Sequence, residues 1–279
     1  MPVSYWLIAG LILMQQLIAA PVIFGSGQHH AGMDPEIELI ASHTAPSSHF
    51  YTDHLENIYF IDGHRIIRIN AATGRRVEYS PLPTSPVTSA DVSNPMQLLL
   101  FYRDFNFARF LDNNLTPLRP ALNFSELGIE QALLACTSGR GGLWVFSDRE
   151  HRLVYFDQQL RNTHRSIIIS NITGGGEKPV YMTESQNRLF LHIPRKGILV
   201  FDRYASYLRT VPYDGPVRFQ VSGNRIIWFG EGGMAVMNIE TGEKGKLELP
   251  GEIVADDARL QPDRLYVLSE GRIHVYRFR

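Results

Sequence analysis

The sequence Leu143-Trp144-Val145-Phe146 is followed by the polar connection Ser147-Asp148-Arg149-Glu150-His151-Arg152 and then by Leu153-Val154-Tyr155-Phe156-Asp157. Both apolar runs are rich in the aliphatic, aromatic and β-branched side chains that favour strands. The charged connection between them is short and has the composition of a solvent-exposed turn. This stretch therefore predicts a β-hairpin.

Five more hairpins of the same kind are predicted along the chain, at residues 58–70, 98–112, 189–202, 226–238 and 265–276. Five of the six end on an Asn or Asp, whose short side chain can cap the following turn and tolerate a left-handed backbone. These terminal residues are 36 to 45 positions apart and are Asn70, Asp112, Asp157, Asp202 and Asn238. A unit that repeats about every 40 residues is typical of β-propeller blades.

Further short runs flank the hairpins and complete four strands per unit. Polar outer strands are predicted after three hairpins, at 76–79, 166–169 and 246–249. Inner strands are predicted before four of them, at 88–92, 132–136, 180–183 and 217–221. Four antiparallel strands in each of six units indicate an all-β fold, a six-bladed β-propeller.

One predicted strand, Glu36–Ile40, has no hairpin partner beside it and alternates polar with apolar residues. The last hairpin has no outer strand after it before Arg279. An N-terminal strand placed there would close the ring and leave no open sheet edge. We therefore predict one propeller domain over residues 36–279, preceded by a polar linker at residues 28–35.

The N-terminal segment indicates export. Residues 5–25 are almost wholly apolar and are followed by the small residues Gly25-Ser26-Gly27, as in a secretory signal peptide over residues 1–27. An uncleaved signal anchor is the alternative, because about 20 apolar residues suffice to cross a bilayer. In either form we expect a periplasmic or cell-surface protein that contacts the membrane, if at all, only through residues 5–25.

The unit of apolar hairpin, terminal Asp or Asn and polar outer strand resembles the blades of bacterial six-bladed propeller families, including NHL-like proteins. The runs Leu143-Trp144-Val145 and Ile227-Trp228-Phe229 are also similar to central strands of propellers in periplasmic sensors. The resemblance covers the chain after Pro35. It implies the fold and no catalytic residues, because such families use one scaffold for ligand binding, assembly and unrelated chemistries.

Composition and motifs narrow the function. Lys and Arg total 27 against 28 Asp and Glu, a net charge of −1, so the broad basic footprint of a nucleic-acid-binding protein is absent. Ten His show no spacing typical of metal ligands, and no Gly-x-Ser-x-Gly nucleophile motif occurs. We predict no catalytic residue, no metal and no cofactor.

A binding surface is predicted on the turns in the middle of the blades. In a propeller these turns emerge on one face together with the connections between blades, and four consecutive turns carry mostly basic side chains. Such a face favours an anionic ligand or an acidic partner. The predicted binding residues are Arg103, Asp104, Phe105, Arg149, His151, Arg152, Arg195 and Lys196.

Two functions remain open at this point. The first is a non-enzymatic propeller that binds a protein partner of the cell envelope or an anionic ligand. The alternative is a hydrolase or lyase acting on an extracellular polymer, with acids and bases drawn from several blades and hence no local motif. Converging carboxylates, His or Tyr in the central cavity would favour the enzyme.

Overall fold

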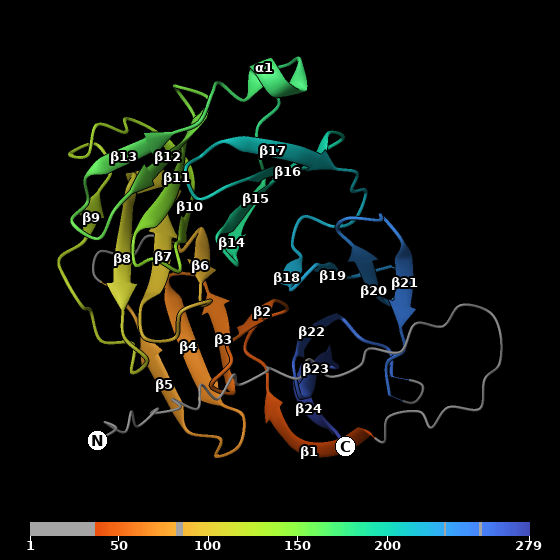
Figure 1. Cartoon of the computed structure of the whole chain (residues 1–279). Coiled ribbons are helices and arrows are strands. Elements are labelled where there is room, and N and C mark those ends of the chain that lie inside the picture. Colours follow the sequence, from red (N-terminus) through yellow and green to blue (C-terminus); the bar gives the residue numbers. More distant parts are fainter. Residues whose placement is uncertain (1–36, 82–85, 232, 251–252) are drawn as a thin grey trace, which may run out of the picture.

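The computed structural model describes residues 37–81, 86–231, 233–250 and 253–279. The predicted signal segment 1–27, the linker 28–35 and Glu36 lie outside these residues. The described chain forms six four-stranded antiparallel sheets arranged in a ring (Figure 1). The expected six-bladed β-propeller is therefore confirmed. Its blades are numbered here in chain order.

In the first three blades the strands run in sequence order from the ring centre outward. Blade 1 contains β2 (Phe50–Thr52), β3 (Asn57–Asp62), β4 (Arg65–Asn70) and β5 (Arg76–Tyr79). Blade 2 contains β6 (Ser89–Asp91), β7 (Leu98–Tyr102), β8 (Phe107–Leu111) and β9 (Leu122–Asn123), with the short 3-10 helix η1 (Arg103–Phe105) between β7 and β8. Blade 3 contains β10 (Ala132–Thr137), β11 (Leu143–Ser147), β12 (Arg152–Phe156) and β13 (Asn162–Arg165).

The next two blades repeat this order, and the last one recruits the N-terminal strand. Blade 4 contains β14 (Tyr181–Ser185), β15 (Arg188–Ile193), β16 (Gly197–Phe201) and β17 (Tyr207–Val211). Blade 5 contains β18 (Gln220–Ser222), β19 (Arg225–Gly230), β20 (Gly233–Asn238) and β21 (Lys244–Leu247). Blade 6 contains β22 (Asp257–Gln261), β23 (Arg264–Ser269), β24 (Arg272–Phe278) and, outermost, β1 (Ile37–Thr44).

The closing strand was predicted correctly. β1 pairs antiparallel with β24 from Ile37 opposite Phe278 to Thr44 opposite Arg272, with a bulge between Leu39 and Ala41. Figure 1 shows β1 beside β24 at the outer edge of blade 6. Segments from the two ends of the described chain thus share one sheet, and β24 has no open edge.

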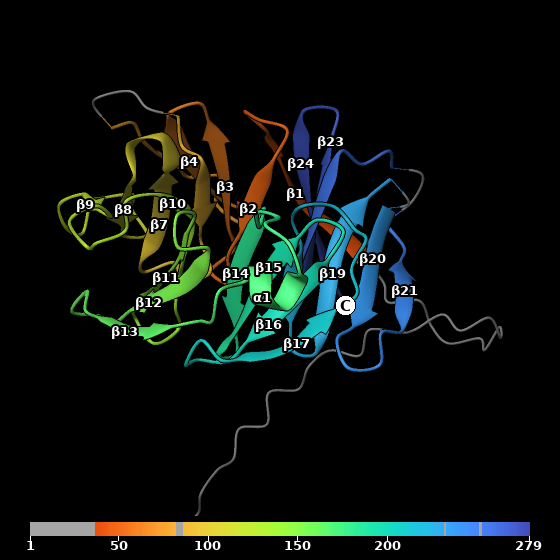
Figure 2. The same ribbon diagram turned by 90° about the horizontal axis from the view of Figure 1, so that it is seen from above.

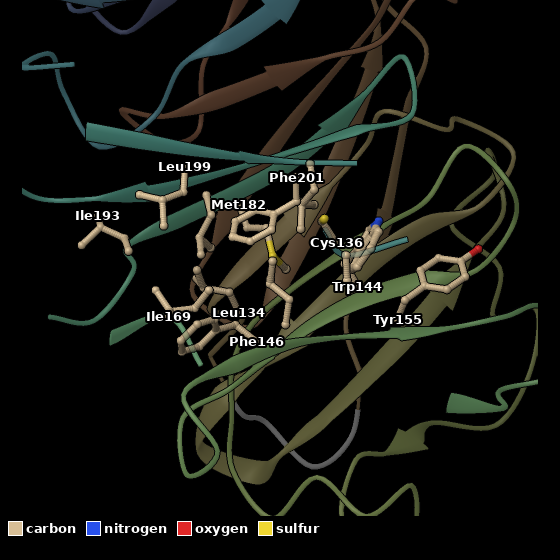
Figure 3. Close-up of a cluster of buried hydrophobic side chains, with 14 residues drawn as sticks. Leu134, Cys136, Trp144, Phe146, Tyr155, Ile169, Met182, Ile193, Leu199 and Phe201 are labelled. Carbon is tan, nitrogen blue, oxygen red and sulfur yellow. The ribbon is translucent and has the colours of Figure 1, made fainter. Parts of the chain in front are cut away.

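The core lies between neighbouring blades. All five residues of β11 are buried, because both faces of this central strand are covered by adjacent sheets. Figure 3 shows the cluster between blades 3 and 4, in which Trp144 and Leu134 pack with Met182 and Phe201. Seen from above, in Figure 2, the blades stand side by side around the ring. The doubly buried strands explain why the hairpins are recognisable in the sequence as nearly continuous apolar runs.

One predicted outer strand is wrong. Residues 166–169 were assigned to blade 3, but the outer strand is β13 and the following connection contains the single-turn helix α1 (Ser170–Thr173). Ile169 is fully buried in the cluster between blades 3 and 4. The run is therefore part of the connection between blades 3 and 4, in which Ile169 packs in the core while Ile167 is 56% exposed. Its apolar composition resembles that of a strand.

Two other boundaries moved by a few residues. The run 217–221 contributes to the inner strand β18 only from Gln220 onward, and the outer strand of blade 5 begins at Lys244, two residues before the predicted start. The Asn and Asp residues cap their turns as expected, since Asp157 Oδ1 accepts hydrogen bonds from the backbone N–H groups of Gln159 and Arg161. In three of these turns the left-handed backbone conformation is adopted by a residue that follows the capping Asp, namely Leu115, Leu160 and Ala205.

Among the residues that the structure describes, no helix has the length and apolar character needed to cross a membrane.

Candidate binding surfaces

The alternation of antiparallel strands divides the ring into two faces. The turn between the second and third strands of each blade and the connection into the next blade lie on one face, which we call the turn face. Backbone hydrogen bonds join these segments, for example from Asp148 N to Gln131 O and from Ile169 N to His151 O. All eight predicted binding residues lie on this face, on the middle turns of blades 2, 3 and 4 or at their edges.

The middle turn of blade 2 is held firmly to blade 3. Asn106 adopts a left-handed backbone with φ 52°, which Asn tolerates better than most residues. Its side-chain Nδ2 donates to Ile129 O at 2.8 Å and to Glu130 O at 3.1 Å, while its Oδ1 accepts from Ala132 N at 2.8 Å. Arg103 Nε also donates to Leu133 O at 3.2 Å. The turn is therefore fixed by contacts that extend beyond its own blade.

Phe105 protrudes from this turn and is 57% exposed. Its ring meets the ring of Phe107 edge to face, with centroids 6.4 Å apart, and Phe107 stacks on the buried Tyr102 at 4.4 Å. This aromatic series supports the exposed ring from below. A large apolar side chain in such a position resembles the aromatic anchors of protein interfaces.

Most predicted basic residues on this face are paired with carboxylates. Arg149 bonds to Glu130, and Arg152 Nε lies 3.6 Å from Glu150 Oε2. Lys196 Nζ lies 3.2 Å from Glu177 Oε1. The backbone of Glu177 itself and the ammonium of Lys196 lower the pKa of the Glu177 carboxyl below its usual value. The surface is thus a mosaic of ion pairs rather than a purely basic patch, and its role in binding stays a prediction.

His151 organises the turn of blade 3. Its Nδ1 accepts a hydrogen bond from Ser170 N at 3.2 Å, so that Nε2 carries the proton and donates to Glu177 O at 3.3 Å. The imidazole also meets Phe146 edge to face at 5.5 Å. These contacts join the middle turn to α1 and to the connection into blade 4.

The ring centre contains polar and aromatic side chains. The guanidinium of Arg218 lies 4.9 Å from the ring centroid of Tyr51, and that of Arg259 lies 5.7 Å from the ring centroid of Phe50. Burial raises the pKa of the Tyr181 phenol, with Asp91 and Tyr51 adding to the shift and the two guanidinium groups opposing it. A phenol with a raised pKa stays protonated and acts as a hydrogen-bond donor, so it is not suited to be a general base at neutral pH.

Asp91 is used to join two blades. Its Oδ2 accepts hydrogen bonds of 2.7 Å from both the backbone N and the Oγ1 of Thr137. Similar contacts join blade 5 to blade 6 and blade 6 to blade 1, where Gln220 bonds to the backbone of Leu260 and Gln261 bonds to Thr52. Several polar side chains of the inner strands therefore form hydrogen bonds that join neighbouring blades of the ring.

A pocket of about 740 Å³ opens on the turn face between blades 5 and 6. Sequence reasoning did not identify it, because its walls come from segments far apart in the chain. The polar residues that line it are His49, Arg218, Glu231, Asp256, Asp257 and Arg259. The larger apolar lining residues are Val217, Phe229, Leu249, Ile253 and Val254.

Asp257 is the most buried charged group of this pocket, with 6% of its surface exposed. Its Oδ1 accepts hydrogen bonds of 2.9 Å from Ala258 N and Arg259 Nη1, whereas its Oδ2 accepts none from the described residues. Burial raises the pKa of this carboxyl, and the nearby Arg259 opposes the shift. Arg218 Nη1 is likewise buried and donates no hydrogen bond to a described residue.

Within the described parts of the chain, no three His, Cys, Asp or Glu residues are grouped so that they could hold a metal ion. The sole cysteine, Cys136, is free and buried, and burial raises the pKa of its thiol. A thiol of this kind is a poor nucleophile and behaves as a small apolar residue.

No model of a known protein family matches this sequence, and no curated protein matches it. Solved structures do. Virginiamycin B lyase from Staphylococcus aureus is 12% identical with a TM-score of 0.53, over 88% of this chain and 100% of the lyase chain. The WD40 domain of Neurospora crassa Pan2 is 9% identical with a TM-score of 0.54, over 88% and 97%.

A third similar structure is the extracellular domain of BT4673 from B. thetaiotaomicron. It is 12% identical with a TM-score of 0.53, and the match covers 82% of this chain and 33% of that one. The three proteins differ in what their names say they do, and identities this low carry no function across. What they share with this chain is the architecture: the protein is a β-propeller.

Proposed function

We propose that this chain is an exported, non-enzymatic propeller that docks a protein partner of the cell envelope on the turn face of blades 2 to 4. The observation that carries the proposal is Phe105, an aromatic side chain that is 57% exposed on a turn fixed to the next blade. The apolar segment at residues 5–25 and the likeness to the extracellular domain of BT4673 support export.

A rigid, exposed aromatic ring is suited to protein recognition. Binding energy in protein interfaces concentrates in a few aromatic and Arg side chains, and an anchor that is already ordered has less conformational entropy to lose. The Asn106 hydrogen bonds and the stacked pair of Phe107 and Tyr102 provide this order. Arg103 lies on the same turn as the anchor, and Arg149 is paired with Glu130, whose backbone carbonyl accepts from Asn106. Charged residues of this kind are typical of the rim of an interface.

The ion pairs favour a protein over a small anion as the ligand of this surface. Glu130, Glu150 and Glu177 compensate Arg149, Arg152 and Lys196, so the net positive field above blades 2 to 4 is small. A mosaic of both signs favours a partner with complementary charges and an apolar pocket for Phe105. A small anion would be attracted only weakly, because the net positive charge of the surface is small.

The test compares Phe105→Ala with the matched control Met96→Ala. Met96 is 59% exposed but lies on the opposite face, between β6 and β7. The tagged full chain and both variants are used to capture proteins from an envelope extract of the source cells. A protein recovered with the parent and with Met96→Ala, but lost with Phe105→Ala, is then purified and titrated against all three.

We expect Phe105→Ala to weaken the binding of this partner by roughly thirtyfold or more in dissociation constant, about 2 kcal/mol, as for an interface hot spot. The joint replacement of Arg103, Arg149, Arg195 and Lys196 by Ser should have a smaller effect and reduce the salt dependence of binding. Equal capture by Phe105→Ala and the parent would exclude this surface as the docking site.

A further inference from the structure

We propose that the face opposite the turn face binds an anionic lipid bilayer, in addition to any membrane contact through residues 5–25. This opposite face is formed by the inner turns, between the first and second strands of the blades, and by the outer turns, between the third and fourth strands. The proposal goes beyond the docking of a protein partner, which concerns the turn face, and either can fail without the other.

The opposite face carries exposed apolar side chains on three blades. Leu55 lies in the inner turn of blade 1, Met96 in the inner turn of blade 2 and Tyr204 in the outer turn of blade 4. Leu208 lies close after Tyr204 in β17, and these four residues are 43% to 59% exposed. Apolar side chains at the tips of turns can enter the boundary between headgroups and acyl chains, and Tyr is enriched at that depth. The face therefore has an apolar component that a lipid surface can cover.

Tyr204 is held in place from inside the protein. Its ring centroid lies 5.4 Å from that of His164, and the His164 centroid lies 5.7 Å from that of Tyr155. Tyr155 in turn contacts the buried Trp144, with centroids 4.8 Å apart. Asp202 Oδ1 accepts a hydrogen bond of 2.8 Å from Tyr204 N and fixes the turn. The exposed ring is thus ordered before binding and has less conformational entropy to lose.

The arginines of this face lack carboxylate partners, whereas Arg149, Arg152 and Lys196 on the turn face are each paired. Five arginines in or directly beside the opposite-face turns of blades 1 to 4 form no ion pair with a described residue, namely Arg75, Arg119, Arg140, Arg188 and Arg203. The guanidinium of Arg203 lies 4.7 Å from the ring centroid of Tyr204, so charge stands beside the exposed ring. Such groups are available to lipid phosphates, which guanidinium geometry matches.

The carboxylates of the same turns do not screen this charge at the surface. Asp112 and Asp202 each accept two backbone N–H groups of their own turns, and Asp53 is buried. None of the carboxylates in these turns of blades 1 to 4 is exposed, whereas Arg188 and Arg203 are. This part of the face therefore presents positive charge outward, and an anionic membrane attracts it.

The contact does not extend to blade 5. Its outer turn carries the exposed carboxylates of Glu240 and Glu243, which form no ion pair with a described residue. An anionic surface repels such groups, so we expect the ring to meet the bilayer tilted toward blades 1 to 4.

The chain enters the propeller on the same face. β1 begins at Ile37 opposite Phe278, the last residue of β24, and both lie at the opposite-face end of blade 6. The apolar segment ends at residue 25, and a connection over residues 26–36 reaches at most about 40 Å when fully extended. A signal anchor in the bilayer would therefore keep the opposite face near the lipid and leave the turn face accessible to a partner.

The first test separates the face from the apolar segment. A chain that begins at Gln28 keeps every described strand, because the closed ring lies within residues 37–279. It is sedimented with vesicles of phosphatidylcholine alone or of equal parts of phosphatidylcholine and phosphatidylglycerol. We expect at least about fivefold tighter binding to the anionic vesicles, since even one Arg at such a surface contributes about this factor.

Variants at exposed positions assign the contact, because they leave the fold intact. Tyr204→Ser with Leu208→Ser should weaken binding to the anionic vesicles at least about tenfold, through lost apolar burial. Arg188→Gln with Arg203→Gln should weaken it about twentyfold and leave binding to neutral vesicles unchanged. The matched control on the turn face is Ile167→Ser with Lys178→Gln, which should bind as the parent does. Both of its residues are exposed.

The second test uses the full chain and reports orientation. Cys136 is free and buried, so a polarity-sensitive dye labels a cysteine introduced at the exposed Ser206 or Lys178 selectively. In anionic vesicles, dye emission should shift to shorter wavelength for Ser206→Cys and stay unchanged for Lys178→Cys. The proposal is overturned if the chain from Gln28 does not bind anionic vesicles, or if Tyr204→Ser with Leu208→Ser binds them unchanged. A shift at Lys178→Cys without one at Ser206→Cys would also overturn it.

Discussion

The indole nitrogen of Trp144 in blade 3 donates a hydrogen bond of 2.5 Å to Glu184 Oε2 in blade 4. The second oxygen of the same carboxylate, Oε1, accepts from Gly139 N at 3.0 Å. Trp144 is fully buried, so its N–H group has no access to water. One side chain of an inner strand thus satisfies two donors of the neighbouring blade and joins the two sheets near the ring centre.

Removal of this carboxylate should destabilise the fold. We expect Glu184→Ala to lower the free energy of unfolding by about 2 kcal/mol, because it leaves the buried Trp144 N–H unpaired. Glu184→Gln retains one acceptor oxygen, so its free energy of unfolding should lie between those of the parent and of Glu184→Ala. Urea unfolding monitored by tryptophan fluorescence measures the change. The exposed Glu240→Ala is the control, with an effect within about 0.5 kcal/mol, and an equally small effect of Glu184→Ala would show that the contact is not stabilising.

Strand β1 should be necessary for the ring. We compare a chain that begins at Ile37 with one that begins at Ala45 and therefore lacks β1. Ile37 packs on the cluster between blades 5 and 6, and Ile40 and Ala41 pack on the cluster between blades 6 and 1. Without β1 the backbone of β24 becomes an open edge. The shorter chain should melt at least about 10 °C lower by circular dichroism, and it should aggregate on heating. Identical melting temperatures would contradict closure by this strand.

The sequence was sufficient to predict the blades because their middle strands are covered on both faces. The run from Leu143 to Phe146 is apolar at every position, and all of it is buried. The inner strands β2 and β22 gave no comparable signal, because β2 has three residues and β22 is mostly polar. Ile169 was misassigned for the opposite reason, since an apolar connection that packs in the core has the composition of a strand.

Of the two candidate sites, the surface around Phe105 could be predicted from the sequence and the pocket between blades 5 and 6 could not. Phe105 was selected from the sequence as an aromatic residue beside a turn, and the structure shows it exposed. The pocket could not be found in this way, because His49, Arg218 and Asp257 belong to three blades and their proximity depends on ring closure.

Stability should depend on pH through His192. Burial lowers the pKa of this imidazole, which lies against Tyr213 and Phe219 and whose Nδ1 donates to Val217 O at 3.1 Å. The unfolded chain then binds a proton more readily than the native one once the pH falls below the unperturbed value of 6.5. The free energy of unfolding should therefore decrease as the pH falls through this range, by at most about 1.4 kcal/mol per pH unit for one group.

His192→Phe removes the titrating group and should flatten this part of the pH profile. Urea unfolding of the parent and the variant is measured between about pH 7.5 and about pH 5, which is the range in which histidine titrates. The comparison gives the contribution of His192 to the pH dependence of the free energy of unfolding. His54→Asn, at an exposed position, is the control and should keep the parental slope. A parental slope in His192→Phe would assign the pH dependence to other groups.

Gly197 is required where the middle turn of blade 4 enters β16. Its φ is +96°, and a Cβ built on it would lie 2.4 Å from Val211 O in β17. Gly197→Ala therefore combines an unfavourable backbone conformation with a clash against main-chain atoms, which do not yield as a flexible side chain does. We expect a loss of about 3 kcal/mol in the free energy of unfolding. Gly176→Ala is the matched control, because a Cβ there meets nothing within 4 Å. The two variants should differ clearly in urea midpoint, and similar midpoints would mean that β16 and β17 can separate at this end without cost.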